Sequence, residues 1–183
     1  RDRRTGYQAI ADEWISIRPG TDGIFALSMI HVLLKNKLVD DEFLIRYTNA
    51  PQLVVNTPGV KGDGLFYRAD SQTPQVWDLQ KEAFVDGNKP DVTPALFGEF
   101  NAPDGRPLRT AMSILIEKYL DDQYSPEVAA KECGVSAQDI ERIALEMAHV
   151  AFKETITLDV QWTDWAGRKQ DKFIGRPVSM LSL

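Results

Sequence analysis

Cysteine and histidine are scarce in this sequence. Among its 183 residues, Cys133 is the one cysteine, and the two histidines, His31 and His149, lie far apart. A single thiol cannot form a disulfide within the chain or a metal cage made only of cysteines. Two distant histidines do not supply the clustered ligands of a zinc site. These shortages argue against a disulfide-rich protein and against a zinc protein.

Long apolar runs and excess positive charge are also missing. No apolar run approaches the roughly 20 residues that cross a bilayer, and the run 24–34 contains Ser28 and His31, which indicates a buried helix. The net charge of −6 argues against nucleic acid or an anionic membrane as the main partner. With 43% hydrophobic and 26% charged residues, the sequence is that of a globular protein with a sizeable core.

Motifs of common catalytic sites are absent as well. The sequence has no Walker-type phosphate loop and no glycine-rich dinucleotide fingerprint. Cys133 lies at the predicted end of a helix and is expected to be a small, half-buried structural residue, and His31 is expected to be a buried, hydrogen-bonded group. The acidic pairs 40–41 and 121–122 fall at the ends of predicted elements, where carboxylates commonly act as caps. These residues alone assemble no catalytic site.

The most informative stretch is 14–23. Its alternation of apolar and polar residues predicts a short strand over 15–17, which a Pro-Gly pair ends. Thr21 or Asp22 can then cap a helix running over about 24–36. The free N–H groups of a helix N-terminus suit a phosphate, a nucleotide edge or a capping carboxylate. Taken by itself, the simplest interpretation is that Asp22 caps its own helix.

Charged and polar groups around this loop also permit a ligand. Arg3, Arg4 and Arg18 flank it, while Thr21 supplies a hydroxyl and Asp22 a carboxylate. A carboxylate can accept hydrogen bonds from the amino and ring N–H groups of guanine, and arginines and backbone N–H groups can bind phosphate. A nucleotide-type ligand is therefore a second interpretation of the loop.

Capping signals and apolar periodicity predict further helices downstream. They are expected over 40–47, over 108–119, from Ser125 to a stop at Gly134, and from a cap at Ser136 to about 151. The pair between 125 and 148 also matches the pattern of a DNA-binding helix-turn-helix. Its second helix would present three carboxylates against one arginine, Arg142, and DNA phosphates would repel it. Two packed helices are the better interpretation.

Short apolar segments predict strands among these helices. They are expected over 53–55, 64–68, 75–79 and 155–160, with a possible strand over 96–100 and a tryptophan-rich loop over 161–168. The first three would form a small β meander. Because helices and strands are intermixed, we expect an α/β fold, a Rossmann-like αβα body with a small β-meander insertion. The chain starts without methionine and ends on an apolar stretch, so we expect a fragment of a larger multidomain subunit.

The stretch Ala11–Asp22, which reads ADEWISIRPGTD, resembles the molybdopterin oxidoreductases, the dimethyl-sulfoxide-reductase family. Four further segments resemble the family in the same order: Arg4-Thr5, His31–Pro51 with its ending Tyr-Thr-Asn-Ala-Pro, Ser125–Ala148 with its Ser-Pro-Glu start, and Trp162–Trp165 together with Gly175–Val178. The last segment is similar to sulfite dehydrogenase-like members.

This resemblance implies an internal fragment of a catalytic subunit that binds molybdenum through molybdopterin guanine dinucleotide. In the family, the loop matching Arg18–Asp22 lies against the guanosine end of the cofactor. The resemblance therefore implies that the cofactor-binding residues are Arg4, Thr5, Arg18, Gly20, Thr21 and Asp22, with no catalytic or metal-ligating residue in this chain. Many members have Asp-Pro-Arg upstream, where this sequence has Arg1-Asp2-Arg3. The implied division is a cofactor-edge α/β segment over 1–52, the β insertion over 53–91, and a helical segment over 92–183 that returns to the α/β body.

The resemblance also implies what this chain does not contain. Iron–sulfur cysteines and the molybdenum ligand would precede residue 1, and a second nucleotide-binding region would follow residue 183. We therefore expect the chain alone to be inactive and without cofactor, while its parent transfers two electrons and an oxygen atom to or from a small sulfur oxyanion or similar substrate.

Expected partners are an iron–sulfur electron-transfer subunit and the rest of the catalytic subunit, with no nucleic acid and no membrane insertion. The expected compartment is the cytoplasm, or the periplasm if a twin-arginine signal precedes the chain. The competing hypothesis is a non-catalytic protein-interaction domain without cofactor, in which the loop only caps its helix.

Overall fold

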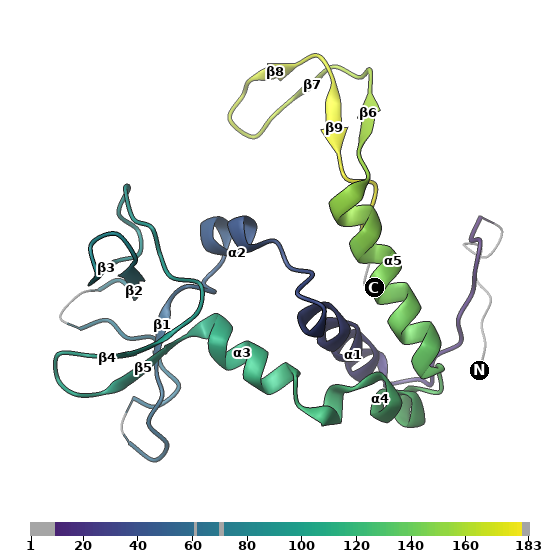
Figure 1. Ribbon diagram of the computed structural model, residues 1–183. Helices are drawn as coiled ribbons and strands as arrows, with labels where there is room; N and C mark the ends of the chain where they lie inside the picture. Colours follow the sequence, from purple (N-terminus) through teal and green to yellow (C-terminus); the bar gives the residue numbers. More distant parts are fainter. Residues whose placement is uncertain (1–9, 61, 70–71, 181–183) are drawn as a thin grey trace. The chain divides into compact units, whose positions relative to one another are not determined.

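The contacts within the chain divide it into two units. A computed structural model describes residues 10–60, 62–69 and 72–180, so Arg4 and Thr5 lie outside the described residues. One unit, the helical unit, comprises Arg1–Leu38 and Asp122–Leu183, and the other, the β unit, comprises Val39–Asp121. Figure 1 shows the elements of both units. The β unit is thus inserted between two parts of the helical unit.

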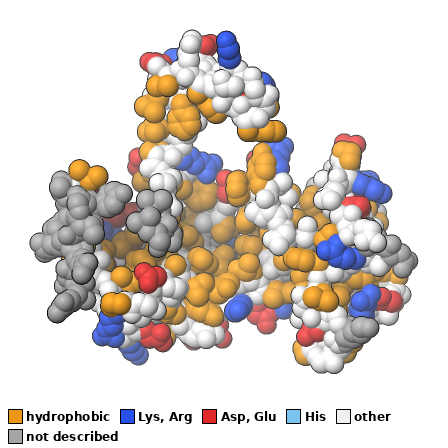
Figure 2. Space-filling model, turned by 180° about the vertical axis from the view of Figure 1, so that it is seen from behind, with side chains coloured by type: hydrophobic (Ala, Val, Ile, Leu, Met, Phe, Trp, Pro, Cys, Tyr) orange, Lys and Arg blue, Asp and Glu red, His pale blue; other side chains and the backbone are white. Residues whose placement is uncertain are grey.

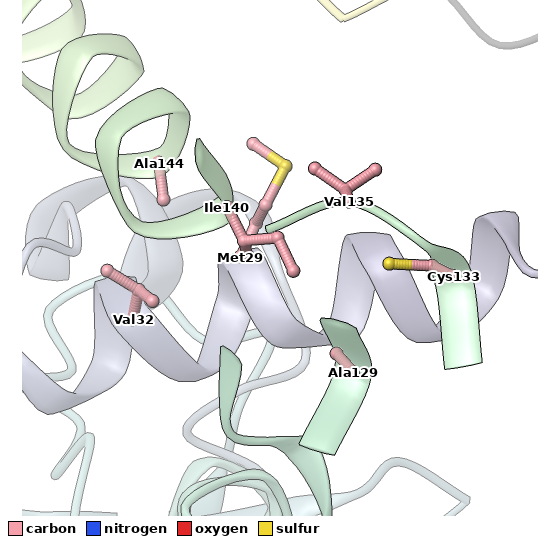
Figure 3. Close-up of a cluster of buried hydrophobic side chains, with 7 residues drawn as sticks. All are labelled: Met29, Val32, Ala129, Cys133, Val135, Ile140 and Ala144. Atoms are coloured by element: carbon pink, nitrogen blue, oxygen red, sulfur yellow. The ribbon is translucent and has the colours of Figure 1, made fainter. Parts of the chain in front are cut away.

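The helical unit is built from α1 (Asp22–Lys35), the 3-10 turn η2 (Asp122–Tyr124), α4 (Pro126–Cys133) and α5 (Ala137–Lys153). The three α-helices pack around a buried cluster (Figure 3), which consists of Met29, Val32, Ala129, Cys133, Val135, Ile140 and Ala144. Each helix contributes the apolar positions that recur every three or four residues, as an amphipathic helix requires. The predicted helix pair 125–151 is therefore confirmed as two packed helices.

Local signals explain where α4 and α5 begin and end. Pro126 occupies the first turn of α4, and Gly134 ends it in the left-handed region, with φ +80°. Ser136 caps α5: its Oγ accepts from the Asp139 amide at 3.0 Å and donates to an Asp139 carboxylate oxygen at 2.7 Å. Hydrogen bonds from Ser136 and then Arg142 lower the pKa of Asp139.

Beyond α5, a β arm (residues 155–176) is formed by two short antiparallel pairs. Strand β6 (Ile156–Leu158) pairs with β9 (Phe173–Gly175), and β7 (Trp162–Thr163) pairs with β8 (Lys169–Gln170). The strand predicted within 155–160 is confirmed. The expected loop over 161–168 is wrong, because it contains β7 and a tight turn that Asp164 closes by accepting the Ala166 and Arg168 amides, each at 2.9 Å.

The β arm leaves many apolar side chains in contact with solvent. Trp165 at its turn is 95% exposed, and Ile174 is 66% exposed. Figure 2 shows hydrophobic side chains gathered on the arm. A two-stranded ribbon of this kind buries little surface of its own.

The β unit begins with α2 (Asp41–Tyr47), and Asp40 caps it by accepting the Phe43 amide at 3.0 Å, which confirms the predicted helix. An antiparallel sheet follows in the order β1 (Leu53–Val55), β5 (Pro107–Thr110), β4 (Glu99–Asn101). A second antiparallel pair consists of β2 (Gln75–Asp78) and β3 (Ala83–Asp86), and α3 (Ala111–Tyr119) follows β5 directly. The core contains Leu53, Val55, Tyr67, Ala102 and Leu108, with Trp77, Phe84 and Phe100 packed against it.

Three predicted elements are wrong in kind or extent. Residues 15–17 lie in an irregular segment, since no strand pairs with them among the described residues. The predicted strand 64–68 is reduced to a single bridge between Phe66 and Val54. The predicted helix 108–119 begins three residues later, because residues 107–110 form the central strand of the sheet and pair on both sides.

All strand pairs in the described part of the chain are antiparallel. A Rossmann-like body contains parallel strands, and the described residues form no parallel pair. The predicted αβα body stays a prediction. The predicted segments 1–52, 53–91 and 92–183 also stay predictions. Within the described ranges, no helix combines the length and the apolar character needed to cross a membrane.

Candidate functional site

The segment before α1 is packed onto the helical unit without forming a strand. Ile15 and Ile17 are partly buried and contact its core, while Ser16 between them is exposed. The alternation seen in the sequence therefore reflects one buried side of an extended segment. This segment leads into the loop Arg18–Asp22, which contains four of the six predicted cofactor-binding residues.

Arg18 fixes the start of this loop on the end of α4. Its backbone amide donates to the Cys133 carbonyl at 2.9 Å, and its Nη1 donates to the carbonyls of Lys131 at 2.8 Å and Glu132 at 3.2 Å. The last carbonyls of a helix have no partner within the helix and carry the negative end of its dipole. Arg18 thus satisfies three of them, two through its positively charged guanidinium and one through its backbone amide.

Gly134 makes this contact possible. A Cβ atom at this position would lie 3.3 Å from Nε and 3.4 Å from Cγ of Arg18. The same glycine has φ +80°, a conformation that L side chains rarely adopt. Glycine after α4 therefore both ends the helix and leaves room for the arginine side chain.

The loop itself is a tight turn closed on the Arg18 carbonyl. That oxygen accepts from the Thr21 amide at 3.2 Å and from the Thr21 hydroxyl at 2.6 Å. Pro19 and Gly20 occupy the two central positions, and Gly20 has φ +83°, which is the arrangement of a type II turn. A Cβ added at Gly20 would meet nothing within 4 Å, so the outer side of the turn is open.

The N-terminus of α1 has no side-chain cap. Thr21 occupies the N-cap position, but its hydroxyl is turned toward the Arg18 carbonyl and accepts no bond from the first helical turn. Asp22 is the first residue of the helix and is exposed, with no hydrogen bond or ion pair to another described residue. The expectation that Thr21 or Asp22 caps α1 through its side chain is wrong. Within the described ranges, no side chain caps this end of α1, and no described residue pairs with the Asp22 carboxylate.

A cluster of charges fixes the preceding segment on α5. The Nη2 of Arg142 donates to both carboxylate oxygens of Glu13, at 2.7 and 2.8 Å, and Arg142 also contacts Asp139 at 3.3 Å and Glu146 at 3.2 Å. The hydrogen bonds that Arg142 donates to Glu13 and then to Asp139 are the main causes that raise the pKa of the Arg142 guanidinium. The loop is therefore held at two places, by Arg18 on α4 and by Glu13 on α5.

The structure thus brings together Arg18, Gly20, Thr21 and Asp22, while Arg4 and Thr5 lie outside the described residues. Cys133 and His31 are buried in the helical unit, as expected of structural residues. No group of three or more potential metal ligands occurs among residues 10–60, 62–69 and 72–180. Sequence reasoning missed Gly134 and Arg142 as supports of the loop. The glycine was recognised only as a helix end, and no local pattern links Arg142 to Glu13.

Comparison with known proteins relates the chain to several oxidoreductase subunits. It is 38% identical to a sulfite dehydrogenase subunit of Allochromatium vinosum, over 96% of this chain and 19% of that protein. It is 34% identical to the alpha subunit of perchlorate reductase of Dechloromonas aromatica, over 75% of this chain and 19% of that protein. It is 32% identical to a putative dimethyl sulfoxide reductase catalytic subunit of Halobacterium salinarum, over 73% of this chain and 16% of that protein. No protein-family model matches the chain. The chain therefore spans less than a fifth of the length of these relatives.

Proposed function

This chain belongs to the molybdopterin oxidoreductase (dimethyl-sulfoxide-reductase) family, and from that premise we propose that it forms one wall of the pocket for molybdopterin guanine dinucleotide. The observation that carries the proposal is the uncapped N-terminus of α1 beside the exposed Asp22. Helix N-termini bind anions through their free N–H groups, and a carboxylate pairs with the N–H groups of guanine.

The residues of the loop fit such a group in their chemistry. Asp22 would accept from the guanine base, and the first N–H groups of α1 would face phosphate oxygens. Gly20 leaves the outer side of the turn open, so a ligand can approach the backbone closely. The Thr21 hydroxyl is already used within the turn, which makes Thr21 a support of the loop in the proposed pocket.

The bound group would supply molybdenum for a two-electron oxidation or reduction with transfer of an oxygen atom. The residues of this chain would hold and orient its nucleotide end, and none of them is proposed to act on substrate. The relatives carry sulfite, dimethyl sulfoxide and perchlorate in their names. We propose that the parent protein acts on a small sulfur oxyanion or a similar compound.

The remaining proposals concern the parent protein. We propose that this chain contributes to a Rossmann-like αβα body, that the rest of the same catalytic subunit completes the pocket, and that an iron–sulfur subunit exchanges electrons with it. The names of the sulfite dehydrogenase and perchlorate reductase relatives describe each as one subunit, which is consistent with an assembly of several chains. The proposed compartment is the cytoplasm, with the periplasm as the alternative.

Titration of the chain with guanosine diphosphate tests the proposed pocket. We expect binding in the millimolar range, since one wall alone contributes, and weaker binding of adenosine diphosphate, whose base lacks the N–H pattern of guanine. Asp22→Ala should weaken guanosine diphosphate binding about tenfold, the loss of roughly 1.4 kcal/mol expected for a charged hydrogen-bonding partner. Isothermal titration calorimetry measures both quantities.

Asp41→Ala is the matched control, because Asp41 is also an exposed first residue of a helix, α2. It should leave nucleotide binding unchanged, and both variants should change the stability only slightly. Absence of binding by the unmodified chain, or equal affinity for the guanine and adenine nucleotides, would count against the pocket. The competing hypothesis, a protein-interaction domain whose loop only caps its helix, predicts that no nucleotide binds. The Thr21 side chain makes no cap hydrogen bond, which argues against that hypothesis.

A further inference from the structure

We propose that Arg18 is a positioning residue that sets the location of Gly20–Asp22 by capping the C-terminus of α4, and that it does not bind the nucleotide phosphates. This inference rests on the proposed function of the loop, and it changes the role that the sequence resemblance implies for Arg18. The inference follows from the carbonyls to which the N–H groups of Arg18 donate.

Arg18 uses its N–H donors on the end of α4. The backbone amide and Nη1 of Arg18 bind three consecutive carbonyls, those of Lys131, Glu132 and Cys133. These carbonyls end α4 and have no other donor within the helix. If the guanidinium turned to a phosphate, two of them would lose their charged donor. The position of the side chain is therefore determined within the protein.

The space around the Arg18 side chain also fits this contact. The Arg18 side chain lies over Gly134, where a Cβ atom would approach Nε to 3.3 Å. Glycine at this position leaves a surface on which the arginine stem packs. The end of α4 is thus shaped to receive Arg18.

The contact of Arg18 with α4 also determines where the ligand-facing residues lie. The amide and side chain of Arg18 face α4, while its carbonyl accepts both bonds that close the turn on Thr21. Thr21 in turn precedes Asp22, the first residue of α1. One residue therefore connects the end of α4 to the start of α1, and the position of the loop depends on its contact with α4.

The two roles of Arg18 predict different losses in a variant. A residue that binds phosphate contributes to the affinity for guanosine diphosphate but not to the affinity for guanosine, which has no phosphate. A positioning residue contributes equally to both, because it places the Asp22 carboxylate and the backbone N–H groups together. The ratio of the two affinities therefore distinguishes the roles.

The experiment compares Arg18→Ala and Arg18→Lys with the unmodified chain. Calorimetry gives the affinities for guanosine and guanosine diphosphate, and NMR amide hydrogen exchange without nucleotide gives the protection of the residue 18 and Thr21 amides. In Arg18→Ala we expect both affinities to fall by the same factor, about tenfold, and both amides to exchange about tenfold faster, which corresponds to roughly 1.4 kcal/mol. Arg18→Lys keeps the positive charge but lacks the planar guanidinium. Its affinities and exchange rates should lie between those of the unmodified chain and those of Arg18→Ala.

Arg68→Ala is the matched control, since Arg68 also donates from Nη1 to a backbone carbonyl, that of Gln72, but lies in the β unit. It should change neither quantity. Loss of affinity for guanosine diphosphate alone, with unchanged guanosine affinity and unchanged exchange, would overturn the inference. If the unmodified chain bound neither compound, the proposed function would fail, while the exchange data would still decide whether Arg18 positions the loop. Should Arg18→Ala fail to fold, Arg18→Lys provides the same comparison.

Discussion

The glycine that follows α4 provides a quantitative test of how Arg18 is held. Gly134 and Gly20 both adopt the left-handed conformation, with φ +80° and +83°, and both lie in the helical unit. They differ in their surroundings, since Arg18 contacts the position of a Cβ at Gly134 and nothing lies within 4 Å at Gly20. Substituting alanine at each site therefore separates the conformational cost from the steric cost.

The expected magnitudes follow from these surroundings. Alanine in the left-handed region costs about 1 kcal/mol at either site. At Gly134 the Arg18 side chain must also shift by a few tenths of an ångström, which weakens its bonds to the Lys131 and Glu132 carbonyls and adds about 1 kcal/mol. We expect Gly134→Ala to lower the free energy of unfolding by about 2 kcal/mol and Gly20→Ala by about 1 kcal/mol.

Urea denaturation followed by far-ultraviolet circular dichroism measures both values, because α1, α4 and α5 supply most of the helical signal. The double variant with Arg18→Ala and Gly134→Ala is the decisive control. In the Arg18→Ala background, the additional cost of Gly134→Ala should disappear, as a double-mutant cycle requires for residues in contact. Equal destabilisation by Gly134→Ala and Gly20→Ala would refute the reasoning.

Two further predictions concern the core and the β arm. Ile140→Ala should lower the free energy of unfolding by about 3 kcal/mol in the same assay, since it opens a cavity at a fully buried position, whereas Leu145→Ala, at a position 37% exposed on the same helix, should cost well under half of that. Hydrogen bonds, of which that from the Arg168 amide has the largest effect, lower the pKa of Asp164. The ionised carboxylate therefore stabilises the turn fully at pH values above the ordinary pKa of an aspartate, and this stabilisation is lost as the pH falls below about 4. Acid titration should shift the NMR signal of the Trp162 indole N–H, which is hydrogen-bonded within the arm. Asp164→Asn should remove that shift. An indole signal that does not change with pH in the unmodified chain would contradict this role of Asp164.

The helices were predictable from the sequence because their signals are local. Ser136, Asp40 and the glycine after α4 fix helix ends through neighbours three or four residues away, and the structure confirms all three. The strands were less predictable, since a strand depends on a partner. Residues 15–17 have the alternation of a strand, but no strand pairs with them in the part of the chain that the structure describes. Residues 107–110 continue a helical pattern yet pair with strands on both sides.

The candidate site shows the same division between local and distant information. The sequence places Arg18, Gly20, Thr21 and Asp22 in one loop, and a Pro-Gly pair is a known signal for its turn. The partners of Arg18 on α4 lie 113 and 114 residues away, and no pattern in the sequence joins them. The orientation of the Thr21 hydroxyl, which leaves α1 without a side-chain cap, likewise depends on the exact geometry of the turn.

The insertion of the β unit between α1 and α4 also has a consequence for the order of events during synthesis. When α1 leaves the ribosome, the helices that cover its apolar side have not yet been made, because the whole of Val39–Asp121 is translated first. At about 5–20 residues per second, this interval lasts roughly 4 to 17 s. During that time the apolar face of the nascent α1 lacks the partners that α4 and α5 later provide, so a chaperone that binds this face would protect α1 until these helices emerge.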